Sequence, residues 1–472
     1  MQNDKQQKIG MPNQRNSGHG NGGKMKYGIR LGKYALSVLG AATLISTGIS
    51  GVSLASGIKA STSLHNHAAV KRSLAPITIG VISPFSGGEA FIGQLNNAQT
   101  YPSVSLINKA GGILGHQIVI KDVDTKNDPA DALPATEQFL ATNSNVLMVM
   151  APQTTEAPTL APVFNRDKII MWSGAGEASF DHSTMPYFWR GLYSDPANGM
   201  AMAMWAKREG WTRIATVFGS DGGSQGDLPG VLQGLKKVPG MKLVTSLNVT
   251  PDQPSYKAQV ARLLNSKPQA IFTEEDPTTG ATFFGELQQQ EGASQHIRVI
   301  VTATGGESSW TGPVEAAMGK SNFLRAFSAV SFQAPAPNPA TKLFDSALLS
   351  QASNVPNPSQ FLGFPGVKIG FDGLTTIALA AVEANSINPT VVDKYVMDVA
   401  NPGKGKQTVY SFAEGVKLIH EGKKIRYVGS SGGFIFDKYH NSSGNQVAIG
   451  MSPSGASITK WVITNQMIAN VG

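Results

Sequence analysis

The sequence has 472 residues, 41% of them hydrophobic, and a formal net charge of +8 at pH 7. Ten of its 39 Lys and Arg residues precede Ser73, with one of its 31 acidic residues, so 29 basic and 30 acidic residues follow. The basic character therefore belongs to the N-terminal segment, and the nearly neutral remainder argues against nucleic-acid binding. Cysteine is absent, which excludes disulfides, cysteine nucleophiles, thiolate metal sites and a lipid-modified N-terminal cysteine.

The N-terminal segment is predicted to precede the folded part of the chain. Residues 1–24 are rich in Asn, Gln and Gly without apolar periodicity, so we expect a disordered leader. Residues 25–55 place basic residues before an apolar stretch ending in Ser53-Leu54-Ala55, which favours a cleaved signal peptide. An uncleaved N-terminal anchor is the alternative. Either interpretation, followed by a polar linker at 56–76, predicts an exported protein on the periplasmic or extracellular face of the cytoplasmic membrane.

The first part of the folded chain is typical of a β-α-β-α-β unit. Short runs rich in Val and Ile at 77–88, 116–129 and 144–155 are separated by helix-length segments, as in parallel sheets covered on both faces. Pro102 is expected to interrupt the first helix, and Asp128 to cap the second. In such sheets, the loops after the strands converge on a crevice that binds ligands.

The same pattern then continues and is repeated. A helix and a strand at 154–174 complete the first unit, and from Arg213 a second unit alternates strands with helices. We expect the Gly-rich DGGSQGD to be a loop before a helix at 228–237. The C-terminal part is predicted to hold a Pro/Ala/Asn-rich stretch at 331–360, then helices at 372–385, 390–401 and 415–424, a glycine-broken turn and hairpin at 425–446, and a last strand at 461–467.

Enzymatic motifs are weak or absent. Gly174–Ser179 is similar to a dinucleotide fingerprint, but it ends in Ser and follows the fourth strand instead of the first. The sequence has no nucleophile elbow, no P-loop and no histidines in HExxH spacing. We therefore predict binding without chemistry, with no cofactor and no metal.

Several motifs in order carry a family resemblance over roughly residues 77–460. They are IGVISPFSG, SLINKAGGILGHQIVIKDVDTKNDPADA, RIATVFGS, IGFDGLTTIALAAVEA and IRYVGSSGGFIFDKYHNSSG. The chain resembles extracytoplasmic solute-binding proteins of ABC importers, in the leucine/isoleucine/valine-binding-protein-like group with the type I periplasmic-binding fold. The resemblance implies an α/β protein of two Rossmann-like lobes with mainly parallel sheets, joined by a three-segment hinge. Lobe one would comprise 77–193 and 331–428, and lobe two 194–330 and 429–472.

The resemblance also implies a function and partners. The chain would be the substrate-binding component of an ABC transporter, capturing a small polar solute, such as an amino acid or an amide-like compound, in the cleft between the lobes. It would deliver that solute to a membrane permease that works with ATPase subunits, and it would contact the membrane through the permease or through an uncleaved anchor. The alternative is a membrane-tethered ligand sensor or receptor module that uses the same cleft closure.

Carried over by position, the resemblance implies a ligand site with contributions from both lobes. Hydroxyls and backbone amides of lobe one would hold a carboxylate, although Thr154 and Thr155 could instead simply cap the next helix. The position of the family's ammonium-binding acid corresponds to residues near 304–306, where this sequence has no acidic residue. One of Glu177, Glu274, Glu275, Asp276 or Glu307 would therefore have to bind the ammonium group instead. The acidic triplet at 274–276 could equally be a solvated loop. The predicted ligand-binding residues are Ser86, Gln153, Thr154, Thr155, Gly174, Ala175, Gly176, Ser224, Gln225, Glu275, Asp276 and Gly305.

Overall fold

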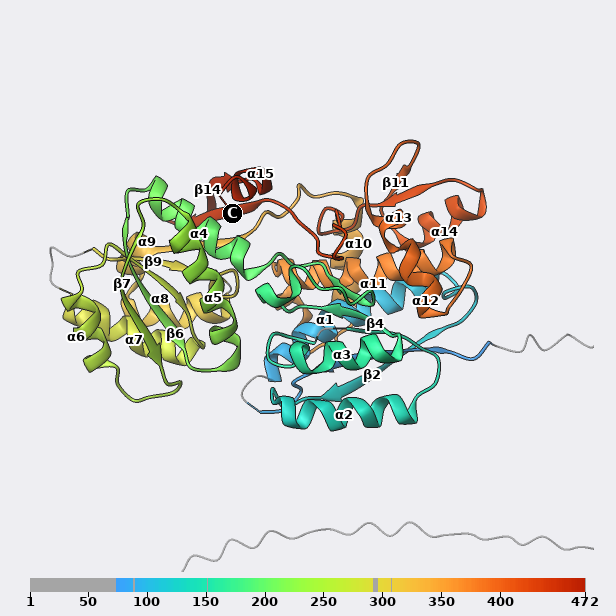
Figure 1. The fold of residues 1–472 in the computed structure, drawn as a ribbon, viewed down its shortest axis with the longest axis horizontal. Helices are drawn as coiled ribbons and strands as arrows, with labels where there is room; N and C mark the ends of the chain where they lie inside the picture. Colours follow the sequence, from blue (N-terminus) through green and yellow to red (C-terminus); the bar gives the residue numbers. More distant parts are fainter. Residues whose placement is uncertain (1–73, 88–89, 151, 292–295, 307, 472) are drawn as a thin grey trace, which may run out of the picture. The chain divides into compact units, whose positions relative to one another are not determined.

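The computed structural model describes residues 74–471, apart from 88–89, 151, 292–295 and 307. The predicted leader, the signal peptide or anchor, most of the linker and Glu307 therefore lie outside the described residues. The remaining chain contains two large, mainly parallel sheets and a small two-stranded one (Figure 1). The predicted α/β class is confirmed.

The first sheet has the strand order β2-β1-β3-β4-β5, with every neighbouring pair parallel. Every residue of β1 is buried, as expected for a strand with helices on both faces. Its strands are β1 (Ile77–Ser83), β2 (Ile118–Asp124), β3 (Val146–Met150), β4 (Ile170–Ser173) and β5 (Phe188–Arg190).

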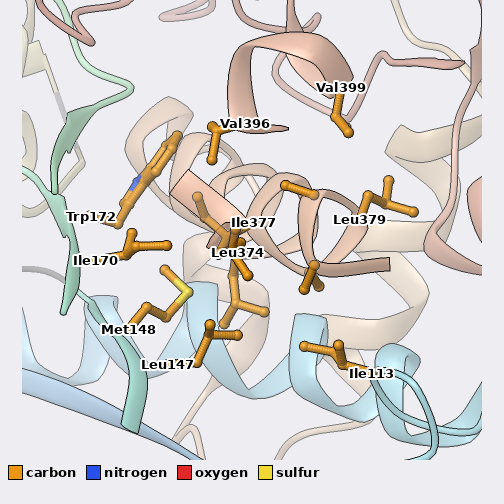
Figure 2. Close-up of a cluster of buried hydrophobic side chains, with 14 of the residues drawn as sticks. Ile113, Leu147, Met148, Ile170, Trp172, Leu374, Ile377, Leu379, Val396 and Val399 are labelled. Carbon is orange, nitrogen blue, oxygen red and sulfur yellow. The ribbon is translucent and has the colours of Figure 1, made fainter. Parts of the chain in front are cut away.

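Alternate residues of β1 face opposite helical layers because side chains on a strand alternate between its two faces. Ile79 and Val81 belong to the core beneath the long helix α11, whereas Ile82 packs on the other face with Phe139 and Leu160. Figure 2 shows the first core, where Leu374 and Ile377 meet side chains of β3 and β4. The helices around this sheet are α1 (Ala90–Lys109), α2 (Pro129–Thr142), α3 (Ala157–Asp167), α10 (Pro339–Leu349), α11 (Pro365–Glu383), α12 (Pro389–Val392), α13 (Val396–Ala400) and α14 (Phe412–His420).

The prediction that Pro102 interrupts the first helix is wrong, because α1 runs through it without a break. A proline inside a helix costs about 3 kcal/mol through its missing N–H and its clash with the preceding turn. Burial offsets this cost, since Val104 and Ile107 join the core and each buried side chain of this size contributes roughly 1.5–3 kcal/mol. The next residue also reaches α11, where the hydroxyls of Ser103 and Thr375 are 3.0 Å apart.

The second sheet has the order β14-β13-β10-β9-β8-β6-β7, in which β13 is antiparallel to both of its neighbours, β10 and β14, and the other neighbouring pairs are parallel. Its strands are β6 (Arg213–Gly219), β7 (Lys242–Val249), β8 (Ala270–Glu274), β9 (Arg298–Val301), β10 (Phe327–Phe332), β13 (Gln446–Met451) and β14 (Ser457–Ile463). Its helices are α4 (Asp195–Arg208), α5 (Gly222–Lys237), α6 (Lys257–Asn265), α7 (Pro277–Gln290), α8 (Ser308–Met318), α9 (Lys320–Ala326) and α15 (Asn465–Ala469). Ile214 and Phe218 pack in one core with α4, α5 and α15, and Ala215 and Val217 in another with α6–α9.

The prediction that DGGSQGD forms a loop is wrong, since its glycines form the first turns of α5. Asp221 caps the helix, with its carboxylate accepting from the backbone N–H of Ser224 at 2.9 Å. A cap of this kind typically contributes about 1 kcal/mol, enough to help offset the poor helix propensity of glycine. Asp221 is a typical N-cap residue and could have indicated the start of the helix, but the glycines that follow it favoured the prediction of a loop.

Elements in the C-terminal third also differ from the prediction. The Pro/Ala/Asn-rich stretch contains the end of β10 and all of α10, which Asn338 begins with a capping box. The helix expected at 390–401 is broken into α12, a short 3-10 turn and α13. The strand expected at 461–467 ends at Ile463, because Thr464 caps α15.

Over the residues that the structure describes, the chain crosses three times between elements that pack around the first sheet and elements that pack around the second. It leaves β5 for α4, returns from β10 to α10, and crosses again from β12 (Ile425–Tyr427), the parallel partner of β11 (Gln407–Val409), to β13. Helix α11 is long and apolar enough to span a membrane, but most of it is buried in the first core. The lobe boundaries stated above stay a prediction, with β10 extending across the boundary at 330–331.

Candidate functional site

The loops that follow β3 and β4 lie side by side, as the parallel topology predicts. Gly174 donates its N–H to the carbonyl of Pro152 at 3.3 Å, and a Cβ on Gly174 would lie 2.8 Å from Gln153 Oε1. The N–H of Ala175 is also engaged, with Ser173 Oγ at 3.0 Å. The structure thus brings Gln153, Gly174 and Ala175 together. Ser86, by contrast, is exposed and donates to Asp124 Oδ2 at 2.6 Å.

Thr154 and Thr155 do not cap α3. The cap position is Glu156, which makes no side-chain cap hydrogen bond. Instead, both threonines abut the first turns of α5: a Cβ on Gly222 would lie 2.9 Å from Thr155 Oγ1, and one on Gly226 2.2 Å from Thr154 Cγ2. The loop after β3 of the first sheet therefore meets a helix of the second, and the approach requires glycine on that helix.

Glu156 is a residue that the sequence reasoning missed. It is fully buried, with Oε1 accepting from Thr125 Oγ1 at 2.6 Å and Oε2 accepting from the N–H of Gln153 at 3.2 Å. Burial raises the pKa of its carboxyl, which the bond from Thr125 partly opposes. Glu156 thereby fixes the backbone that presents Gln153 and the two threonines.

The predicted lobe-two residues are engaged within their own elements. Ser224 donates its hydroxyl to Asp221 at 2.8 Å, and Gln225 donates Nε2 to the carbonyl of Gly219 at 2.5 Å. Gly305 is a buried residue of a 3-10 turn, and a Cβ built on it would lie 2.8 Å from Val301. These contacts place the side chains of Ser224 and Gln225 at the start of α5, where both already form hydrogen bonds with residues just before the helix.

The acidic triplet at the end of β8 is not a solvated loop. Asp276 caps α7 by accepting from two backbone N–H groups at 2.9 Å. Glu275 is 5% exposed and accepts hydrogen bonds from Thr273 and from Trp310 Nε1, the latter at 3.0 Å. Burial raises the pKa of Glu275 to about 8. Glu275 is therefore a core residue of its lobe, and Glu274 is the member of the triplet that faces other acids.

A group of four carboxyls, which we call the acidic cluster, links both sheets. Glu177 follows β4, Asp195 begins α4, Asp227 lies on α5 and Glu274 ends β8. The side chains of Asp195 and Glu274 each lie within hydrogen-bond reach of Asp227. Burial raises the pKa of all four, that of Glu177 to about 7, and neighbouring acids further raise the pKa of Glu177, Asp195 and Glu274. Sequence reasoning considered Glu177 and Glu274 but not Asp195 and Asp227, which no local pattern connects.

Comparison with known proteins identifies the family. Residues 76–391 match the family model for periplasmic binding proteins. The Leu/Ile/Val-binding protein homolog 3 of Brucella melitensis is 30% identical over 97 residues, 21% of this chain and 26% of that protein. Glutamate receptor 2.4 of Arabidopsis thaliana is 25% identical over 162 residues, 33% of this chain and 18% of the receptor. These alignments span about a quarter or less of the relatives' lengths.

Solved structures agree on the fold. The leucine binding protein LivK of Thermotoga maritima has a TM-score of 0.62 at 17% identity, covering 83% of this chain and 99% of LivK. A solute binding protein of R. palustris in complex with benzoate has a TM-score of 0.61 at 14% identity, covering 82% of this chain and 97% of that one. Because the family model matches more than half of the chain, this protein belongs to the periplasmic binding protein family, whose members bind solutes and are not enzymes.

Proposed function

We propose that the chain is the substrate-binding component of an ABC transporter, and that it captures a small polar solute between its two lobes. The observation that carries this proposal is the contact of Thr154 and Thr155, after β3, with the glycines of α5. In this arrangement the loop after β3 of one sheet faces the start of a helix on the other, and hydroxyls of Thr154, Thr155 and Ser224 lie on these two segments. Such surfaces bind small polar ligands.

The mechanism that we propose is hinge closure. Each lobe supplies part of the solute's contacts, so only the closed form satisfies all of its polar groups, and the solute shifts the population toward that form. The three crossing segments would act as the hinge. Closed, solute-loaded protein would then dock on a permease that works with ATPase subunits, outside the cytoplasmic membrane. No part of this proposal requires a cofactor or a metal.

Solute binding should make the protein more compact and more stable. We expect one or more members of a panel of amino acids, amides, small carboxylates and amines to raise the melting temperature of the purified full-length chain by a few degrees, because a ligand at 100 times its Kd adds about 2.7 kcal/mol. Small-angle X-ray scattering with the same solute should show a smaller radius of gyration. Stabilisation without any compaction would contradict hinge closure.

Replacing Gly226 by Val should weaken solute binding while leaving both lobes folded. The new side chain would collide with Thr154, and overpacking of this kind costs about 1–3 kcal/mol, equivalent to roughly 10-fold or more in affinity. Isothermal titration calorimetry with the panel solute that binds would measure the change. Gly223→Val on the same helix is the matched control, since a Cβ there approaches only Asp221 Oδ1, at 3.4 Å. Equal affinities for the two variants would refute the role of this contact.

A tethered sensor or receptor is the second candidate. The observation that favours it is the similarity to glutamate receptor 2.4 of Arabidopsis thaliana over 162 residues. This candidate requires the segment at 25–55 to remain attached as an anchor. N-terminal sequencing of the exported protein would decide, because a mature chain that begins near Ser56 would have lost its tether.

A further inference from the structure

The acidic cluster lacks the countercharge that buried carboxylates require. Both carboxylate oxygens of Glu177, Oδ2 of Asp195 and Oε2 of Glu274 are buried without a hydrogen-bond partner. Within the described chain, none of the four acids takes part in a salt bridge. Arg190 lies near enough to attract Glu177 and Asp195, but its guanidinium donates to Asp181 Oδ1 at 2.5 Å. Ionised carboxylates are unfavourable when they are buried without partners, so these acids retain protons, and a bound cation with N–H donors would stabilise their charged forms.

The position expected to hold a ligand carboxylate is occupied by an acid of the protein itself. A Cβ built on Gly176 would lie 1.8 Å from Asp195 Oδ1, and the N–H of Asp195 donates to the carbonyl of Gly176 at 2.8 Å. The neighbouring N–H groups of Gly174 and Ala175 already donate to protein oxygens. A carboxylate that approached this loop would meet Asp195 and, beyond it, the rest of the cluster. A bound carboxylate would repel the ionised form of Asp195 at such distances.

The four acids come from segments that a closing movement would bring together. Glu177 belongs to the loop after β4 of the first sheet, Asp227 and Glu274 to elements of the second, and Asp195 to the first crossing segment. A ligand held by all four would therefore contact both lobes and the hinge, so its binding would be coupled to closure. Ammonium and guanidinium groups suit such a site, because they offer several N–H donors to carboxylate oxygens.

We infer that the acidic cluster recognises an organic cation, a solute that carries one or more ammonium or guanidinium groups and no carboxylate. This inference rests on the proposed solute-binding function and specifies its ligand class. A bare metal ion suits the site less well, because no group of three or more His, Asp or Glu side chains in the described residues has an arrangement that could hold one. This ligand class differs from the amino acids isoleucine and leucine, which are bound in complexes of two structural neighbours.

The test is isothermal titration calorimetry on the full-length chain with 1,4-diaminobutane and butylguanidine, against L-leucine, benzoate and MgCl2. We expect the two organic cations to bind and the others not to. Asp227→Asn should weaken diamine binding by roughly 30-fold or more, as expected when one partner of a buried charge pair is removed. Glu177→Gln is the second variant, since no other residue donates a hydrogen bond to the Glu177 carboxylate. Glu209→Gln, an exposed acid at the end of α4, removes the same charge and should bind as the unmodified chain does.

The outcomes separate this inference from the proposed function. Compaction with leucine or benzoate but not with the cations would overturn the inference and leave solute binding intact. Binding of Mg2+ that depends on Asp227, without binding of the organic cations, would also overturn it. If no solute binds and scattering shows no compaction, both the inference and the proposed function fail. Unchanged diamine affinity in both cluster variants, with melting temperatures equal to that of the unmodified chain, would place the cation elsewhere and refute the inference.

Discussion

The free energy of unfolding should be highest in mildly acidic solution and should fall as the pH rises from about 4.5 to about 8. Burial raises the pKa of Glu275 to about 8 and that of Glu177 to about 7, both above the ordinary glutamate value of 4.5. In this window the unfolded chain has released protons that the folded chain still holds, so raising the pH favours unfolding. The stabilisation is complete below the unfolded pKa and is lost as the pH passes through the folded one. The other members of the acidic cluster act in the same direction.

The pKa shifts set an upper limit on this change in the free energy of unfolding. A tenfold change in proton affinity corresponds to about 1.4 kcal/mol, so Glu275 alone could contribute on the order of several kcal/mol. Glu177 contributes less, because its residue is partly exposed and water screens its charge. Urea denaturation at constant ionic strength between pH 4.5 and 8.5 would measure the slope. Glu275→Gln should flatten it, whereas Glu209→Gln at an exposed site should not. Stability that rises across this window would contradict the assignment.

Replacing Asp372 by Ala should destabilise the chain by about 3–5 kcal/mol, because several buried donors would lose their acceptor. Asp372 is fully buried on α11 and accepts from Tyr427 Oη at 2.9 Å and from the N–H groups of Ser430 and Ser431 at 3.0 and 2.6 Å. Alanine would leave these three donors buried without partners, and each unsatisfied donor costs roughly 1–3 kcal/mol.

Asp372→Asn is the matched comparison, because asparagine keeps one acceptor oxygen in almost the same volume. We expect the order of stability to be Asp, then Asn, then Ala, measured as the free energy of unfolding in urea at pH 7. Asp372 also joins α11 to the third crossing segment, so the alanine variant should reduce the cooperativity of unfolding. A loss below about 1 kcal/mol for alanine would show that water satisfies the three donors.

Local patterns predicted most of the framework correctly. The apolar run of β1, the cap at Asp128 and the alternation of strands with helices depend on residues close together in sequence. The meeting of Gln153 with Gly174 was predictable too, because loops at the carboxyl ends of adjacent parallel strands must converge. Pro102 and the glycines of α5 misled the prediction, since packing and capping outweighed their intrinsic propensities.

The sequence by itself determined the fold class, the order of the elements and the loops from which a ligand site could be built. Only the tertiary structure decided which acids face one another: it buried Glu275 in a lobe core, and it brought Asp195 and Asp227 to Glu274. The physical reason is that propensity, capping and hydrophobic periodicity act over a few residues, whereas the electrostatic environment of a carboxyl depends on neighbours from distant segments. No local sequence pattern could therefore predict the charge of the site.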